Sequence, residues 1–247
     1  MTDDPRLADA KPRGFEPQLE AYGDRAVIVV LGDNLDIAVN RKVHRLAAAV
    51  GRLRSAAAGE ASPPADRRLA GIGRPVAGFA TLLVPFDPDA IDGDEVRALV
   101  VPLLEQLAEV DEPATPNGEP LRIAVRYGGD GGPDLAALAE LHGLRPADVV
   151  ELHSSTTYDV LFLGFAPGFG YLGFVPEAIA TPRRSTPRPR VPAGSVGIAG
   201  SQTCVYPFAT PGGWNLIGRT GTRMWDVGQS EPALLRPGQR VRFVPER

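Results

Sequence analysis

The sequence predicts an α+β protein of two domains, a ferredoxin-like α+β domain followed by a small closed barrel or sandwich. The first half shows the order strand pair, helix, strand, helix, with an apolar stripe on each predicted helix. The second half has glycine or proline every few residues between short apolar runs, which is typical of tight turns joining short strands. A length of 247 residues is sufficient for two cores of this size.

Composition divides the chain further. The predicted segments are a flexible tail at residues 1–14, the ferredoxin-like domain at 15–112, a linker at 113–120 and the barrel domain at 121–247. The linker lies in a stretch rich in proline and acidic residues. Small residues and two adjacent prolines at 55–70 predict a second flexible segment, inside the first domain.

The first domain begins with a predicted hairpin at 18–31 that turns around Gly23. A helix follows, with Asp36 as its N-cap. Its apolar stripe has a spacing of 4-3-4-3: Val39, Val43, Leu46, Val50 and Leu53. Residues 79–86 predict a strand. The second helix starts at Asp92, which forms a capping box with Glu95, and Pro102 predicts a kink or a break in it.

The second domain begins with a strand at 121–127. Pro133 is predicted as the first residue of a short helix that ends at Gly143, and Pro146 begins another. Residues 159–165 predict a buried strand, and 240–244 predict the closing strand. The two helices superficially suggest a helix-turn-helix reader of DNA. The second of them carries Asp148 and Glu151 without lysine or arginine, so it would repel phosphate.

The totals exclude several classes of protein. A formal net charge of -4 argues against general nucleic-acid binding. Apolar runs are far shorter than the ~20 residues that span a bilayer, and the N-terminus lacks the apolar core of a signal peptide. One cysteine permits no intrachain disulfide, which agrees with a cytoplasmic location. The three histidines have no metal-ligand spacing, so we expect no metal site.

Neither of two common nucleotide-binding motifs fits the sequence. Gly168, Gly170 and Gly173 match the dinucleotide fingerprint in letters, but Val175-Pro176 follows and no helical periodicity is present. We therefore interpret them as turn glycines. The chain also lacks a P-loop motif, so we expect any ATP to be bound without one.

Arginine is concentrated in one stretch of this acidic chain. Residues 162–222 contain one carboxylate, Glu177, and five arginines: Arg183, Arg184, Arg188, Arg190 and Arg219. The four at 183–190 lie among prolines, so they do not form one face of a helix. Either the segment is a solvated loop, or its guanidinium groups bind a carboxylate or phosphate. Neutral hydrogen bonds at such a site would come from Gln202, Thr203 and Tyr206.

Three further residues keep two interpretations each. His153, near a helix end, either caps the helix or forms core hydrogen bonds, or else acts at the ligand site. Trp214 either packs on the barrel or stacks on a planar ligand. Cys204 is most simply a small strand residue, since no partner for a nucleophilic thiolate is evident.

Several motifs in this order resemble one family. They are LEAYGDRAVIV, GFATLLVPFDP, GFAPGFGYLG, TPRRSTPRPRVPAGSVGIAG, QTCVYP and PGGWNLIGRT. The chain resembles allophanate hydrolase subunit 1 over nearly its whole length. That family is also called KipI and the B subunit of 5-oxoprolinase (PxpB). The resemblance implies a cyclophilin-like barrel for the second domain.

The resemblance also implies a function, as one subunit of an ATP-dependent 5-oxoprolinase, which opens 5-oxoproline to glutamate. It implies a second protein of the KipA type, which is the C subunit of 5-oxoprolinase and is also called allophanate hydrolase subunit 2. The A subunit of 5-oxoprolinase is a further potential partner. From the residues themselves, the lack of a P-loop, a metal-ligand set and a triad predicts that the chain is inactive alone and that ATP is bound by the complex. The residues that we predict to be catalytic are His153, Arg183 and Arg184. Alternatives are a KipI-like inhibitor of a sensor histidine kinase and a subunit that acts on allophanate or urea-like amides.

Overall fold

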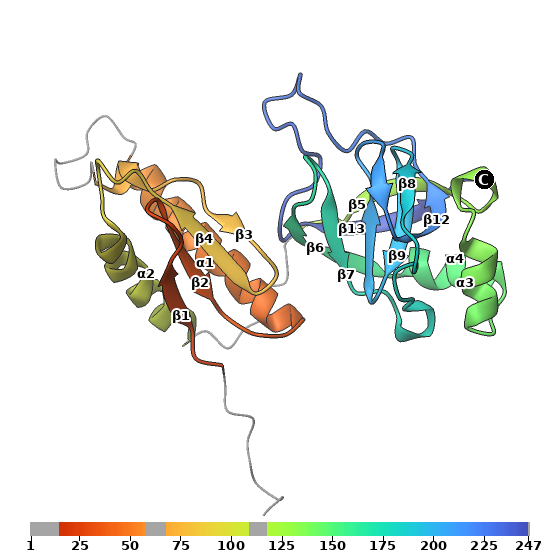
Figure 1. Cartoon of the computed structure of the whole chain (residues 1–247), viewed down its shortest axis with the longest axis horizontal. Coiled ribbons are helices and arrows are strands. Elements are labelled where there is room, and N and C mark those ends of the chain that lie inside the picture. Colours follow the sequence, from red (N-terminus) through yellow and green to blue (C-terminus); the bar gives the residue numbers. More distant parts are fainter. Residues whose placement is uncertain (1–14, 58–67, 109–117, 247) are drawn as a thin grey trace, which may run out of the picture. The chain divides into compact units, whose positions relative to one another are not determined.

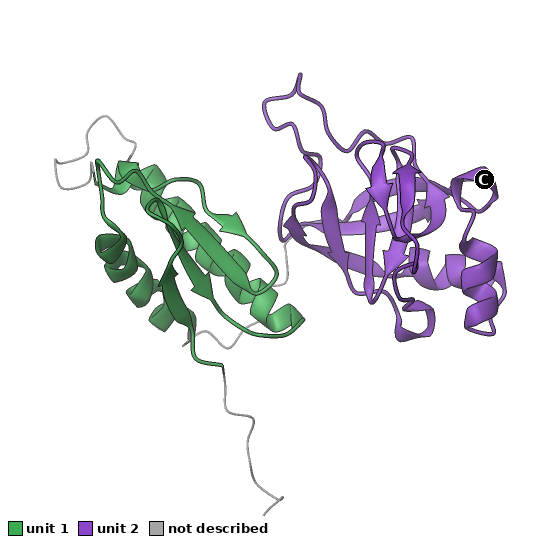
Figure 2. Ribbon diagram, in the orientation of Figure 1, with its two compact units in different colours: residues 1–111 green, residues 112–247 purple. Residues whose placement is uncertain are grey.

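The computed structural model describes residues 15–57, 68–108 and 118–246. The chain divides into two compact units between Asp111 and Glu112 (Figure 1; Figure 2). The predicted tail lies outside the described residues, as do most of the predicted flexible segment at 55–70 and most of the predicted linker at 113–120. Among the described helices, none is long and apolar enough to cross a membrane.

The first unit is a four-stranded antiparallel sheet packed against two helices (Figure 1). The sheet order is β1-β2-β4-β3. The elements are β1 (Gln18–Ala21), β2 (Ala26–Val30), α1 (Ile37–Ala57), β3 (Val76–Ala77), β4 (Thr81–Pro85) and α2 (Gly93–Ala108). The predicted hairpin is therefore present as β1 and β2, and its turn contains Gly23 at a φ of 66°.

Helix α1 begins where the sequence predicts. The side chain of Asp36 accepts a hydrogen bond from the backbone N–H of Ala38 at 2.7 Å, which satisfies one donor of the first turn. The predicted stripe contributes Val43, Leu46 and Val50 to the core, where they pack with Val29 and Leu82 of the sheet. The stripe thus supplies the apolar contact that holds α1 on the sheet.

Helix α2 has the predicted capping box. The N–H of Glu95 donates to Asp92 at 2.8 Å, and the N–H of Asp92 donates to Glu95 at 3.1 Å. The helix continues through Pro102, so a break at this residue is wrong. Pro102 is exposed, and water can therefore bond to the carbonyl that the missing N–H leaves without a partner.

The second unit is a closed seven-stranded barrel with the order β10-β7-β6-β13-β5-β12-β9 (Figure 1). Its strands are β5 (Leu121–Tyr127), β6 (Thr157–Leu163), β7 (Gly170–Gly173), β9 (Ser195–Ala199), β10 (Gln202–Val205), β12 (Asn215–Arg219) and β13 (Arg240–Pro245). Neighbouring strands are antiparallel except β5 and β13, which are parallel. Two short strands, β8 (Arg188–Val191) and β11 (Thr210–Gly212), pair separately.

Side chains on the barrel strands alternate between the interior and the outer face. On β10, Thr203 pairs with Ile198 of one neighbour and Leu172 of the other, and both of these apolar residues belong to the barrel core. Cys204, one residue later, pairs with Tyr171 and packs in a separate cluster. This alternation gives the barrel an apolar interior and a second packed layer on its outer face.

Helices α3 (Leu135–Leu141) and α4 (Pro146–Ser155) connect β5 to β6 and pack against the barrel. Helix α3 begins at Leu135 with Asp134 as its N-cap, so the prediction that Pro133 is the first helical residue is wrong. Pro133 lies before the cap because Asp134 is anchored by its backbone to β12, as described below. The strand predicted at 159–165 is β6, and it begins and ends two residues earlier.

Candidate functional site

Four of the five predicted arginines lie in one exposed segment on the outer face of the barrel unit. We call residues 182–190 the arginine segment. Arg183, Arg184 and Arg190 are exposed, and Arg188, the first residue of β8, is half-buried. The segment is attached to the barrel by the N–H of Arg184, which donates to the carbonyl of Gly213 at 2.8 Å.

A buried aspartate binds two of these arginines. The Oδ1 atom of Asp134 accepts a hydrogen bond from Nη1 of Arg184 at 2.9 Å and from Nη2 of Arg188 at 2.7 Å. Its Oδ2 atom accepts from the backbone N–H of Leu216 at 2.7 Å, and its own N–H donates to the carbonyl of Leu216 at 2.9 Å. We call Asp134, Arg184 and Arg188 the aspartate clamp, since they join helix α3, β12 and the arginine segment.

The aspartate clamp is a charged group in a mostly buried place. The Asp134 side chain is 9% exposed, against 39% for Arg184 and 23% for Arg188. A carboxylate that is removed from water needs charge-assisted hydrogen bonds, and these three bonds supply them. Arg184 and Arg188 therefore have an intramolecular carboxylate partner, which the sequence interpretation did not foresee.

The remaining predicted arginines are arranged differently. Arg219 donates from Nε to the carbonyl of Ala193 at 3.0 Å. Arg183 and Arg190 form no ion pair with any residue that the structure describes. The arginine segment thus holds two guanidinium groups in place and presents two others to solvent.

An aromatic cluster lies on the same outer face. We call Phe162, Phe169, Tyr171, Tyr206 and Trp214 the aromatic face. Phe162 stacks on Tyr171 with ring centroids 4.3 Å apart, and Phe169 meets Tyr171 edge to face at 4.9 Å. Phe169 also contacts the ring of Tyr206 at 5.2 Å. Trp214 is 5% exposed and packs against this cluster, whereas Phe162 and Tyr171 are partly exposed and are the members that a ligand could reach.

The charge of Arg183 reaches this aromatic face. Burial raises the pKa of Tyr171, and the positive charge of Arg183 partly opposes that shift. The same two influences act on the pKa of the Tyr206 phenol and of the buried Cys204 thiol, with burial the larger in each. The backbone bond from Arg184 to Gly213, the residue before Trp214, likewise places the neighbouring Arg183 near the aromatic face. Because burial raises their pKa values, the phenols and the thiol stay protonated at neutral pH.

The loop beside the aromatic face holds an exposed phenylalanine in a strained conformation. Phe165 has a φ of 68°, a region that bulky side chains rarely adopt, and it is 63% exposed. Its ring meets Phe169 edge to face at 5.3 Å. Such strain often occurs at functional sites, so Phe165 joins the candidate site together with Arg183 and Tyr171.

The glycines of the same stretch lie in a turn and a strand. Gly168 has a φ of 76°, and Gly170 and Gly173 are the ends of β7. A phosphate-binding fingerprint would have to open a helix at this point. Their interpretation as structural glycines agrees with this geometry.

His153 lies in the barrel core and not at the aromatic face. Its Nδ1 is 2.8 Å from the hydroxyl of Tyr127, and its Nε2 is 2.8 Å from Oγ1 of Thr203. Since Thr203 gives its one hydroxyl proton to the carbonyl of Gly197, Nε2 of His153 carries the proton and Nδ1 accepts from Tyr127. Full burial lowers the pKa of His153 to about 3, so the ring is neutral.

The structure thus separates the predicted site residues. His153 and Thr203 are in the interior, Tyr206 and Trp214 are in the packed outer layer, and Gln202 is half-buried at the start of β10. Sequence reasoning missed Asp134, Tyr171 and Phe165. The one available signal for Asp134 was an acidic residue just before a helix, which normally indicates only a cap. Among the described residues, no cluster of histidine, cysteine and carboxylate side chains could hold a metal ion.

Comparison with known proteins gives consistent matches. A family model for the carboxyltransferase domain, subdomain C and D, matches residues 17–235. The 5-oxoprolinase B subunit of Escherichia coli O157:H7 is 57% identical over 144 residues, which are 58% of this chain and 66% of that protein, slightly under two thirds of it. The 5-oxoprolinase B subunit of Bacillus subtilis (strain 168) is 38% identical over 234 residues, 92% of either chain.

A solved structure agrees with this. A conserved uncharacterized protein from Pyrococcus horikoshii is 38% identical to this chain, with a TM-score of 0.52. The match covers 93% of this chain and 97% of the other, so both units described above have counterparts in it.

Proposed function

The chain belongs to the family of the 5-oxoprolinase B subunit, and we propose that it is one component of an ATP-dependent 5-oxoprolinase. The reaction opens the lactam of 5-oxo-L-proline to glutamate at the expense of ATP. The proposed partner is a protein of the KipA type, the C subunit of that enzyme. The A subunit is a further member that we propose for the complex.

The observation that carries this proposal within the structure is Arg183, which has no carboxylate partner in the described chain and lies near the aromatic face. 5-Oxoproline carries one carboxylate on a small, nearly planar lactam ring. A guanidinium group binds a carboxylate through two parallel hydrogen bonds. We propose that Arg183 binds the substrate carboxylate and that Tyr171 and Phe165 contact the ring.

The proposed roles within the arginine segment follow from the aspartate clamp. Arg184 and Arg188 have their charge directed to Asp134, so we propose that they position the segment instead of contacting substrate. Arg190 and Arg219 are proposed to add positive potential at the rim. The buried, neutral His153 is proposed to have a structural role, together with Thr203.

The chemistry that such a site must assist is attack on an unreactive amide. Water adds to the lactam carbonyl carbon, the ring C–N bond breaks, and a proton from the water passes to the nitrogen, which leaves as the amine of glutamate. Charge accumulates on the lactam oxygen, where a hydrogen-bond donor stabilises it. Because burial raises the pKa of Tyr171, its hydroxyl keeps its proton and can be such a donor.

ATP supplies the driving force of the overall reaction, yet the described residues do not fit a phosphate-binding loop. Gly168 lies in a turn, and Gly170 and Gly173 are the ends of β7, so the three glycines do not open an α-helix. We therefore propose that ATP is bound by the complex and assign no step involving ATP to this chain.

We also propose finer assignments for the fold. The pattern from β2 to α2 is strand, helix, two strands, helix, and β1 adds an edge strand next to β2, which supports a ferredoxin-like domain. The seven-stranded closed barrel supports a cyclophilin-like second domain. The boundaries 15–112 and 121–247, and a cytoplasmic location, remain proposals from the sequence.

The test is ATP-dependent turnover of 5-oxoproline, measured as glutamate formation by the chain co-expressed with a KipA-type partner. We expect turnover by the complex and none by the isolated chain, because the sequence contains no P-loop motif and the described residues contain no cluster that could hold a metal ion. Robust turnover by the isolated chain would refute the need for a partner. A stable complex that lacks turnover, with the A subunit present as well, would refute the 5-oxoprolinase assignment.

A further inference from the structure

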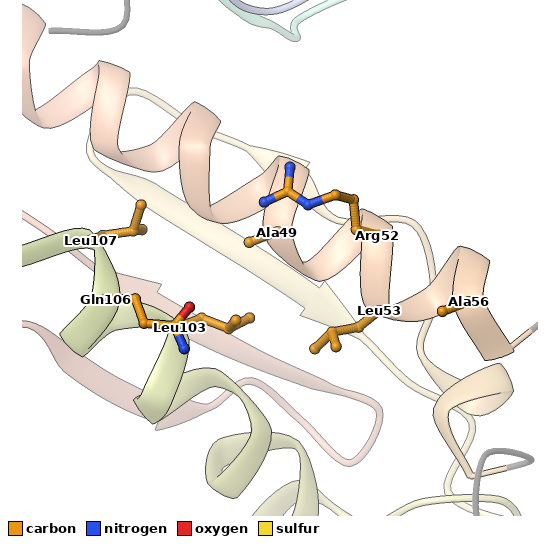
Figure 3. A pocket seen from close by; sticks show the side chains of 7 residues that line it. All are labelled: Ala49, Arg52, Leu53, Ala56, Leu103, Gln106 and Leu107. Atoms are coloured by element: carbon orange, nitrogen blue, oxygen red, sulfur yellow. The ribbon is translucent and has the colours of Figure 1, made fainter. Parts of the chain in front are cut away.

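The first unit, which does not contain the site described above, has a groove between its two helices. Its volume is about 490 Å³. It is lined by Ala49, Arg52, Leu53 and Ala56 of α1 and by Leu103, Gln106 and Leu107 of α2 (Figure 3). Five of these seven residues are apolar, so the groove is an apolar channel with one positive charge at its edge.

The shape of the groove follows from the two helices. Residue numbers increase in opposite directions along α1 and α2, and Leu53 and Leu103 point toward each other between them (Figure 3). The lining positions recur at intervals of three and four residues on each helix, so each helix presents a ridge along the channel. Such a channel accommodates the apolar ridge of a third helix.

The charge on α1 is one-sided. The helix carries five basic residues and no acidic residue, in a chain whose net charge is -4. Lys42 and Arg45 precede Ala49 by seven and four residues, which places them on the same helix face as Arg52. Positive charge therefore extends along α1 beyond the residues that line the groove. Lys42 and Arg52 are exposed, and Arg52 forms no ion pair with a described residue.

We propose that this groove docks an acidic amphipathic helix of a protein partner. The apolar face of that helix would lie between Leu53, Leu103 and Leu107, and its carboxylates would face Arg52 and Lys42. The inference concerns a different unit from the candidate site and does not depend on the proposed function.

Two other occupants are less compatible with the groove. A membrane surface is broad, whereas these apolar side chains line a channel between two helices, and α1 buries Val43, Leu46 and Val50 in the core of the unit. A nucleic acid would present phosphates and few apolar groups to a channel whose lining is mostly apolar.

The test uses the full chain and two synthetic helical peptides of about 18 residues, or five turns. Both have leucine at i, i+3, i+4 and i+7. One carries glutamate on the flanks of the leucines, and the other carries lysine. Binding is followed by fluorescence anisotropy at low and high salt, and the surface is located by amide chemical shifts. We expect the acidic peptide alone to bind, more weakly at high salt, with shifts along α1 and α2.

The matched variants are Arg52→Glu, at the groove, and Arg54→Glu, an equally exposed position of the same helix that does not line it. Neither change reaches the core, so folding is maintained and is checked by circular dichroism. Arg52→Glu should weaken binding roughly fivefold to tenfold, and Arg54→Glu less than about twofold.

The proposal is overturned if both peptides bind equally, if neither binds, or if the shifts lie elsewhere. It is also overturned if the chain self-associates through these helices in analytical ultracentrifugation. Binding to phosphatidylserine vesicles that Arg52→Glu abolishes, without peptide binding, would assign the groove to a lipid surface instead.

Discussion

The barrel unit contains two buried polar centres that are built in opposite ways. In the interior, His153 is neutral and hydrogen-bonds to the hydroxyls of Tyr127 and Thr203. On the outer face, Asp134 binds two guanidinium groups and a backbone N–H. A closed interior favours the neutral network because nothing charged has to be removed from water, whereas at the outer face the guanidinium groups remain partly hydrated.

The difference indicates which of the two centres can bind a charged ligand. The interior centre has every ring nitrogen occupied and no access to solvent. The outer centre fixes Arg184 and Arg188 next to Arg183, which has no such partner among the described residues. Within one segment, Arg184 and Arg188 thus hold the backbone in place through Asp134, and Arg183 is proposed to bind the substrate.

The largest expected effect comes from removing the centre of the aspartate clamp. Asp134→Ala leaves two guanidinium groups and one buried N–H without their acceptor. Breaking a buried ion pair costs about 3–5 kcal/mol, and the 39% exposure of Arg184 places the expected loss near the lower limit, about 3 kcal/mol. Urea unfolding measures it. Asp130→Ala, at an exposed position four residues earlier, should change the free energy of unfolding by less than about 0.5 kcal/mol. Equal effects of the two variants would contradict a role for the clamp.

The buried, neutral His153 of the interior centre should make the free energy of unfolding depend on pH. Burial lowers the pKa of His153 to about 3, below the unfolded value of about 6.5. The stability that this neutral ring maintains is present above pH ~6.5 and is lost as pH falls, because only the unfolded chain binds the proton. We expect a loss of about 1.4 kcal/mol per pH unit between pH ~6 and ~4. His153→Gln should remove that part of the slope. A slope unchanged by the substitution would show that His153 is not the group responsible.

The proposed division of the arginine segment predicts opposite results for two neighbouring residues. Arg183→Ala should lower kcat/KM of the assembled complex about tenfold to 100-fold, since a charge-assisted contact contributes about 1.5–3 kcal/mol. Its free energy of unfolding should stay within about 0.5 kcal/mol of wild type. Arg184→Ala should mainly destabilise, by about 1–2 kcal/mol after allowance for its exposure.

Lysine substitutions sharpen this result. Arg183→Lys should rescue poorly, because it keeps the charge but loses the planar fork. If Arg183→Ala and Arg183→Lys both turn over like wild type in an assembled complex, the assignment of the substrate carboxylate to Arg183 is wrong.

The smallest effect concerns the strained phenylalanine. Phe165→Gly relieves about 1–2 kcal/mol of left-handed backbone strain and adds roughly 0.4–1 kcal/mol of unfolded-chain entropy, so stability should change little. Phe208, which is 39% exposed and is not among the residues with positive φ, gives the control. Phe208→Gly should be less stable than Phe165→Gly by about 1 kcal/mol in urea unfolding. The reverse order would show that Phe165 is held by contacts and not strained.

Much of the local structure was predictable because its causes are local. Asp36 caps α1, and Asp92 with Glu95 caps α2, since a side chain and a backbone N–H two or three residues away meet in almost any helix start. The strand predicted at 121–127 appears as β5 with the same bounds, because its residues alternate between apolar and polar and a run of glycines follows it. Pro102 is the exception, since its exposure allows a helix that sequence rules would interrupt.

By itself, the sequence determined the family, the segment in which arginine gathers, and the order of the main elements of the first unit apart from β3. These depend on periodicity, composition and motifs, which are properties of neighbouring residues. Only the tertiary structure decided which arginines are engaged. The acceptor for Arg184 and Arg188 is Asp134, about 50 residues away in the chain, and it is buried because β12 and α3 meet there. His153 likewise bonds to Thr203, 50 residues later. Partners at such separations are set by how the strands close into a barrel, and no local pattern in the sequence encodes them.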